Sequence, residues 1–160
     1  MATYAQTNQV RTVDRVESSI PSTLWAAPIG RVLFSLIFVL SGFAHFKSET
    51  IAYAASAGVP MANILVPLSG VMAILGGLSI ILGYHARIGA ILLILFLVPV
   101  TFKMHNFWAV ADAQMAQMQM AMFMKNISML GAAVYFFVMG TGPYSLNHKG
   151  DRVRRGIRTY

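Results

Sequence analysis

The sequence contains no cysteine among its 160 residues. Disulfide bonds, thiolate metal sites and thiol redox chemistry are therefore excluded. If the protein takes part in electron transfer, it must bind a redox cofactor to do so.

Charged residues are also scarce. Only 11% of the residues are charged and five are acidic, whereas 57% are hydrophobic, and the mean hydropathy is +0.65. This composition is typical of an integral membrane protein, so the lipid bilayer is its first expected partner. The sequence pI of about 10.2 could point to nucleic acid. No nucleic-acid partner is expected, however, because the basic residues flank apolar segments and fit a membrane orientation signal.

Four apolar segments are each long enough to cross a bilayer as a helix, which takes about 20 residues. They cover residues 28–46, 61–82, 86–104 and 115–140. Turn signals separate them, such as Gly58 and Pro60 before the second and Gly142 and Pro143 after the fourth. The sequence thus predicts an all-α membrane protein, an antiparallel bundle of four transmembrane helices over residues 28–142. Residues 1–27 are predicted to form a polar tail, and residues 143–160 a basic one.

Lysine and arginine are distributed unequally between the two sides of this bundle. The side of both termini holds Arg11, Arg15, Arg31, Arg87, Lys149, Arg152, Arg154, Arg155 and Arg158. The opposite side holds only Lys47 and Lys103. Because basic residues gather on the cytoplasmic side, both termini are predicted to be cytoplasmic, in a bacterial-type inner membrane. The basic C-terminal tail is then expected to bind anionic lipid.

Lys125 and Asn126 interrupt the fourth apolar segment, and no acidic residue lies nearer in the sequence than Asp112. A charge at membrane depth is expensive and usually functional, so this pair is the first candidate for a ligand-binding site. A structural alternative remains, in which Lys125 reaches toward the interface or binds a carbonyl group.

Further polar residues lie in the half of the bundle away from the termini. His45 ends the first span, Asn63 opens the second, and Lys103 and His105 end the third. Together with Lys125, they predict a cavity open to the extracytoplasmic side. In a regular helix Lys103 and His105 point to nearly opposite sides, so at most one of them is expected to face inward. Residues at span ends also commonly reach only interfacial water.

Methionine is enriched in the fourth span and offers an alternative chemistry. Met118, Met122 and His105 could together hold Cu(I), which prefers soft thioether ligands. A methionine cluster also serves as adaptable packing. A haem with His45 and His105 as axial ligands is a further alternative. The residues give no firm metal or haem prediction.

Several ordered segments resemble the DoxX family of small four-helix membrane proteins. They are SGFAHF, GVP, LVPLSGVMAILGGLSIILGYHARIGA, PVTFKMHNFW and MAQMQMAMFMKN, and the resemblance covers about residues 30–146. It implies association with membrane redox processes, because the family takes its name from a subunit associated with a thiosulfate:quinone oxidoreductase. Covalent sulfur chemistry is not expected here, because the chain has no cysteine.

We therefore expect a membrane protein that supports a redox process by binding a quinone-like ligand in an outer-half pocket, together with partner subunits. The expected ligand-binding residues are Lys125, Asn126, His45, His105, Lys103 and Asn63. Such a ligand needs an apolar slot and hydrogen-bond donors at its oxygens. A non-catalytic scaffold subunit and an outward-facing copper-binding protein are the alternatives. The sequence leaves open whether the protein is an enzyme and whether it forms a homo-oligomer.

Overall fold

The structure, a computed structural model, describes residues 22–147. All the regular secondary structure in this part of the chain is helical. The elements in chain order are η1 (Ser22–Trp25), α2 (Ala26–Ala44), α3 (Ser48–Ser56), α4 (Ala62–Leu82), α5 (Ala86–Met104), η2 (Phe107–Ala109) and α6 (Ala113–Met139). The long helices α2, α4, α5 and α6 are each apolar enough to cross a membrane. The predicted all-α, four-span bundle is confirmed. Most of both predicted tails, including the basic residues from Lys149 onward, lies outside the described residues.

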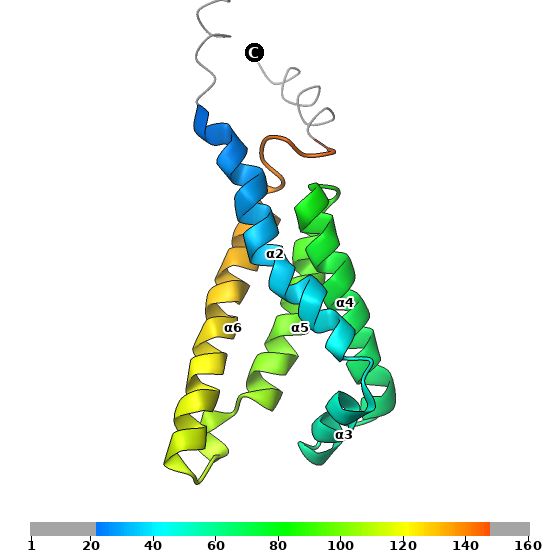
Figure 1. Cartoon of the computed structure of the whole chain (residues 1–160), viewed down its shortest axis with the longest axis vertical. Helices are drawn as coiled ribbons and strands as arrows, with labels where there is room; N and C mark the ends of the chain where they lie inside the picture. The colour runs from blue at the N-terminus through cyan, green and yellow to red at the C-terminus, as the bar shows by residue number, and fades with distance from the viewer. Residues whose placement is uncertain (1–21, 148–160) are drawn as a thin grey trace, which may run out of the picture.

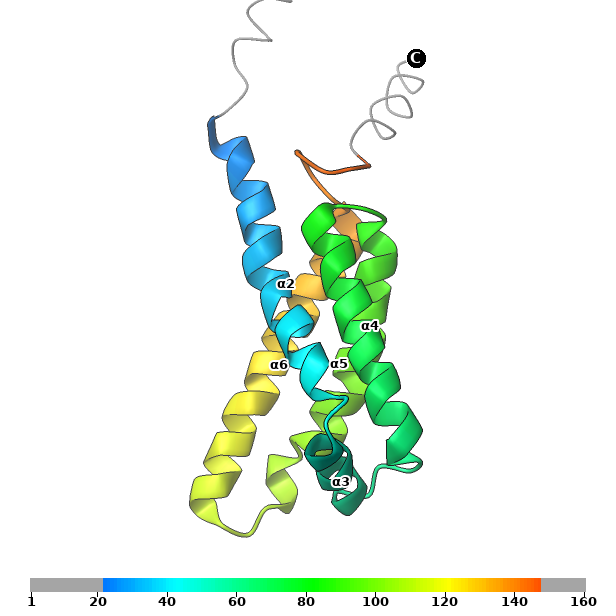
Figure 2. The same cartoon turned by 45° about the vertical axis from the view of Figure 1, so that its right-hand side comes forward.

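In Figure 1, α2 crosses in front of α5, from beside α6 at the end near the termini to beside α4 at the opposite end. Close packing joins α2 to α4, α4 to α5, and α5 to α6. At one end, the termini side, α2 and α6 meet through the rings of Phe34 and Phe136, whose centroids are 5.1 Å apart. Toward the other end, the α3 side, both views show α6 diverging from α2 (Figures 1 and 2). Helices α2 and α6 are thus in contact at the termini side and apart at the other end.

Glycines allow the backbones of α2 and α4 to approach closely. A Cβ atom added to Gly70 would lie 2.7 Å from the carbonyl oxygen of Gly42 on α2 and 2.8 Å from Cβ of His45. The α4 and α5 helices meet in the same way, since a Cβ on Gly76 would lie 2.9 Å from the carbonyl oxygen of Gly89. Small residues are what close helix packing in a membrane requires, because hydrophobic burial gives little drive there. These contacts fix the position of α4 between its two neighbours.

Helix α3 was not predicted from the sequence. Its segment begins with Glu49 in the first turn, where a negative charge favours the helix dipole. It ends where Gly58 adopts a φ of +76° and Val59 N–H donates to the carbonyl of Ala54, which is the geometry of a glycine-terminated helix. Ala54 is buried in a small cluster that includes Val66 of α4. Helix α3 therefore packs against α4, at the end of the bundle away from the termini.

Candidate functional site

A cavity of about 610 Å³ lies between α3, α4 and α5, at the end of α2. Most of its wall is apolar, from α4 and α5 residues that include Leu65, Val66, Met72, Leu95, Phe96 and Met104. The polar side chains in its lining are few, namely His45, Thr50, Tyr53, Ser69 and Lys103. An apolar cavity of roughly 300–1,000 Å³ with a few polar groups is the usual form of a small-molecule site.

The turn after α3 and a proline in α5 shape the walls of this cavity. A Cβ added to Gly58 would lie 3.3 Å from the Nζ atom of Lys103, so the lysine side chain extends from α5 to the turn that follows α3. Pro99 lies inside α5 and has no N–H to donate to the carbonyl of Leu95, four residues earlier. Both Pro99 and Leu95 line the cavity.

His45 is held in one orientation within the lining. Its Nδ1 atom lies 3.4 Å from Oγ of Ser69, and that hydroxyl donates its proton to the carbonyl of Val66 at 2.7 Å. The serine oxygen can therefore only accept from Nδ1–H, so Nε2 of the neutral ring is left as an acceptor. Burial lowers the pKa of His45, which follows the end of α2, and this keeps the ring neutral at pH 7. Its ring also packs against Phe96, with centroids 5.6 Å apart.

The six predicted ligand-binding residues do not lie together in the structure. His45 and Lys103 line the cavity, and the other four do not. Asn126 is buried and Asn63 is exposed in the first turn of α4. Lys125 is exposed on α6, where its Nζ atom donates to the sulfur of Met122 at 3.3 Å.

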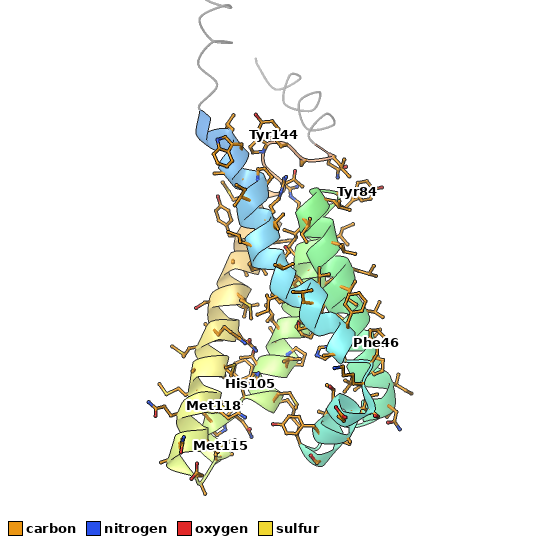
Figure 3. The ribbon with its side chains drawn as sticks, in the orientation of Figure 1. Phe46, Tyr84, His105, Met115, Met118 and Tyr144 are labelled. Carbon is orange, nitrogen blue, oxygen red and sulfur yellow. The ribbon has the colours of Figure 1, made fainter. Side chains whose placement is uncertain are left out.

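His105 belongs to the connection between α5 and α6. Its Nδ1 atom lies 2.8 Å from Oε1 of Gln119 on α6. In Figure 3, His105, Met115 and Met118 lie together at the α3 side of α5 and α6, whereas Phe46 lies with α2 and α4. The described residues contain no group of three or more histidine, aspartate or glutamate side chains placed to hold a metal ion. His45 and His105, the alternative haem ligands, do not share the cavity.

Arg31 has a role that the sequence analysis missed. The side chain, in the second turn of α2, is only 2% exposed. Its guanidinium donates to the carbonyl oxygens of Thr141 at 2.6 Å, Pro143 at 3.2 Å and Tyr144 at 2.6 Å. Arg31 therefore ties the segment that follows α6 to α2, at the termini side. Tyr84 of the α4–α5 turn lies at the same end as Tyr144 (Figure 3).

The model of the DoxX family matches residues 26–106, which comprise α2 to α5. The inner membrane protein YphA of Escherichia coli (strain K12) is 29% identical over 123 residues, which cover 76% of this chain and 87% of that protein. No solved structure matches. All the cavity-lining residues fall within the family match, and α6 falls outside it.

Proposed function

The chain belongs to the DoxX family, and on that premise we propose that it binds a quinone-like ligand in the cavity between α3, α4 and α5. The protein would thereby support a redox process in the inner membrane, with the electrons passing to or from a partner subunit. The family match and the four apolar helices place the chain among multi-pass membrane proteins. The ligand, the redox process and the partner belong to the proposal.

The observation that carries the proposal is the cavity's access from the bilayer. Leu68 of α4 and both Leu95 and Phe102 of α5 line the cavity, yet they are 50%, 57% and 53% exposed. The cavity therefore opens on the outer surface of the bundle, where α4 and α5 face lipid. A lipid-soluble quinone could enter sideways with its ring inside and its apolar chain still in the bilayer.

The polar groups of the cavity suit the two oxygens of such a ring. Nε2 of His45 can accept a proton from a quinol hydroxyl, as a general base. The ammonium group of Lys103 can donate to the other oxygen and stabilise the negative charge that develops there. Both the base and the cation are thus present in a lining that is otherwise apolar.

The distribution of basic residues supports an orientation for this site. Arg31 and Arg87 lie on the termini side, whereas Lys47 and Lys103 lie on the opposite side. With the termini in the cytoplasm, the cavity opens in the extracytoplasmic half of the bilayer. The C-terminal tail would then meet the anionic lipids of the cytoplasmic leaflet.

A cavity-filling substitution tests the site. Leu95→Trp adds an indole to the wall of the cavity at a position that is 57% exposed, so folding should be retained. We expect the affinity for a short-chain benzoquinone to fall about tenfold or more, which is about 1.4 kcal/mol. The matched control is Leu75→Trp, which is 54% exposed on α4 and outside the lining. Fluorescence titration of purified protein in nanodiscs gives the affinities.

A second arm of the same titration tests the polar groups. Lys103→Met should weaken quinone binding about tenfold or more, because a hydrogen bond from a charged donor is lost. Lys103→Arg should retain part of the affinity. Equal affinities for wild type, Leu95→Trp and Lys103→Met would reject this cavity as the quinone site.

A further inference from the structure

The exposed surface of α6 carries a stripe of polar and small side chains. Its members are Gln114, Gln117, Ala121, Lys125, Ser128 and Tyr135, and we refer to them as the α6 stripe. They recur at intervals of three, four or seven residues, so they share one side of the helix. All are exposed, and the α6 stripe contains no large aliphatic side chain. Elsewhere the exposed surface of α6 carries residues such as Ile127 and Val134.

Lys125 is the member of the α6 stripe whose side chain costs the most free energy to place in lipid. It lies near the midpoint of α6 (Ala113–Met139), about 18 Å along the axis from the first residue. Since α6 is about 40 Å long and a bilayer core is about 30 Å thick, Lys125 lies inside the core wherever the core falls along the helix. Among the described residues, its polar contact is the sulfur of Met122, which is a weak acceptor. Lysine side chains inside a membrane are usually paired with a charged group or a carbonyl oxygen, which accepts more strongly than sulfur.

The described part of the chain offers no carboxylate at this depth. Its acidic residues are Glu49 in the first turn of α3 and Asp112 at the start of α6. Asp112 lies about 20 Å from Lys125 along the helix, and its side chain accepts the N–H of Met115. No carboxylate of residues 22–147 can therefore pair with Lys125.

We propose that the α6 stripe packs against a transmembrane helix of a partner protein, and that this helix carries a carboxylate opposite Lys125. Ala121 and Ser128 allow the two helix backbones to approach closely. The Gln117 amide can form interhelical hydrogen bonds, and the Ser128 hydroxyl, which donates to the carbonyl of Met124 at 3.1 Å, can accept one. A second copy of this chain does not fit. A symmetric pair would place two Lys125 side chains at the same depth and face to face.

The proposed interface is independent of the quinone-like ligand. The α6 stripe has no residue in the lining of the cavity. Helix α6 packs on the described bundle through α5 and η2 and, at the termini side, through Phe34 of α2. Since no residue of α6 lines the cavity, a partner helix on the α6 stripe leaves the opening between α4 and α5 free. Failure of either proposal therefore leaves the other standing.

Photocross-linking in the native host membrane tests the interface. A photoreactive amino acid replaces Ala121 on the α6 stripe and, as the matched control, Ile127 on another exposed side of α6. We expect the probe at position 121 to capture a membrane protein whose cross-linked span contains aspartate or glutamate. The probe at position 127 should not capture it. Adding Lys125→Met should reduce the yield about tenfold or more, since the partner's carboxylate is then left unpaired.

Charge reversal distinguishes the proposed ion pair from non-specific association. Lys125→Asp should abolish the cross-link, and replacing the partner's carboxylate by lysine should restore it. Helix content and monodispersity of each purified variant show that the fold is kept. The proposal is overturned by cross-links only to lipid or to a second copy of the chain. It is equally overturned by a partner span without an acidic residue, or by a yield that does not respond to Lys125→Met.

Discussion

Arg31→Met should lower the free energy of unfolding by about 3 kcal/mol or more. The substitution removes three hydrogen bonds from a charged donor, each of which contributes roughly 1.5–3 kcal/mol without being fully additive. It leaves the carbonyl groups of Thr141, Pro143 and Tyr144 without these bonds. The segment after α6 then loses its tie to α2, and the contact between Phe34 and Phe136 is left to hold α2 against α6 at the termini side.

Unfolding by SDS in mixed micelles, followed by far-UV circular dichroism, measures this effect. Arg87→Met is the matched control, since Arg87 is an exposed arginine at the same end of the bundle. Its free energy of unfolding should stay within about 0.5 kcal/mol of wild type. Similar losses for the two variants would mean that the Arg31 contacts have no special role. Arg31→Lys should fall between, because an ammonium group cannot span three carbonyl groups as a guanidinium does.

Gly70→Ala should destabilise the fold by about 2 kcal/mol, as an overpacked core does. The added methyl group would meet the backbone oxygen of Gly42 at 2.7 Å and Cβ of His45 at 2.8 Å, neither of which can move without displacing α2. The same SDS titration measures the change. Gly30→Ala on α2 is the matched control, because a Cβ there has no atom within 4 Å. It should stabilise the helix by about 0.5–1 kcal/mol.

Gly70→Ala should also weaken quinone binding, because His45 reaches the cavity from the end of α2, beside Gly70. A variant that keeps wild-type stability would show that α2 and α4 do not pack through this glycine contact.

The long helices could be predicted from the sequence because each is set by a single strong signal, its hydropathy over about 20 residues. The family resemblance was confirmed for residues 26–106. Helix α3 has no such signal. Its nine residues are too few to cross a membrane and mix polar with small side chains. What determines α3 is the contact of Ala54 with Val66 of α4 and the glycine that ends it, and contacts between segments cannot be read from one segment alone.

The candidate site was harder to predict, because hydropathy does not report how a helix is rotated within its bundle. Lys125 and Asn126 are neighbours in sequence, but successive helix residues point in directions about 100° apart. The structure buries Asn126 and exposes Lys125, so the pair does not act as one group. The same rotation brings Lys103 to the cavity and leaves His105 beside Gln119. Ser69 carried no signal, since a lone serine in an apolar span commonly bonds its own backbone.

Photoaffinity mapping of a quinone tests most directly whether the cavity between α3, α4 and α5 is the ligand site. A benzoquinone with a photoreactive group on its chain is bound to the protein in nanodiscs, irradiated, and located by mass spectrometry of the peptides. We predict labelling of α4 and α5 around Met72, Leu95 and Met104, which line the cavity, and loss of the label when excess unlabelled quinone competes. Competed labelling confined to α6 around Lys125, or labelling that no excess of quinone reduces, would contradict it.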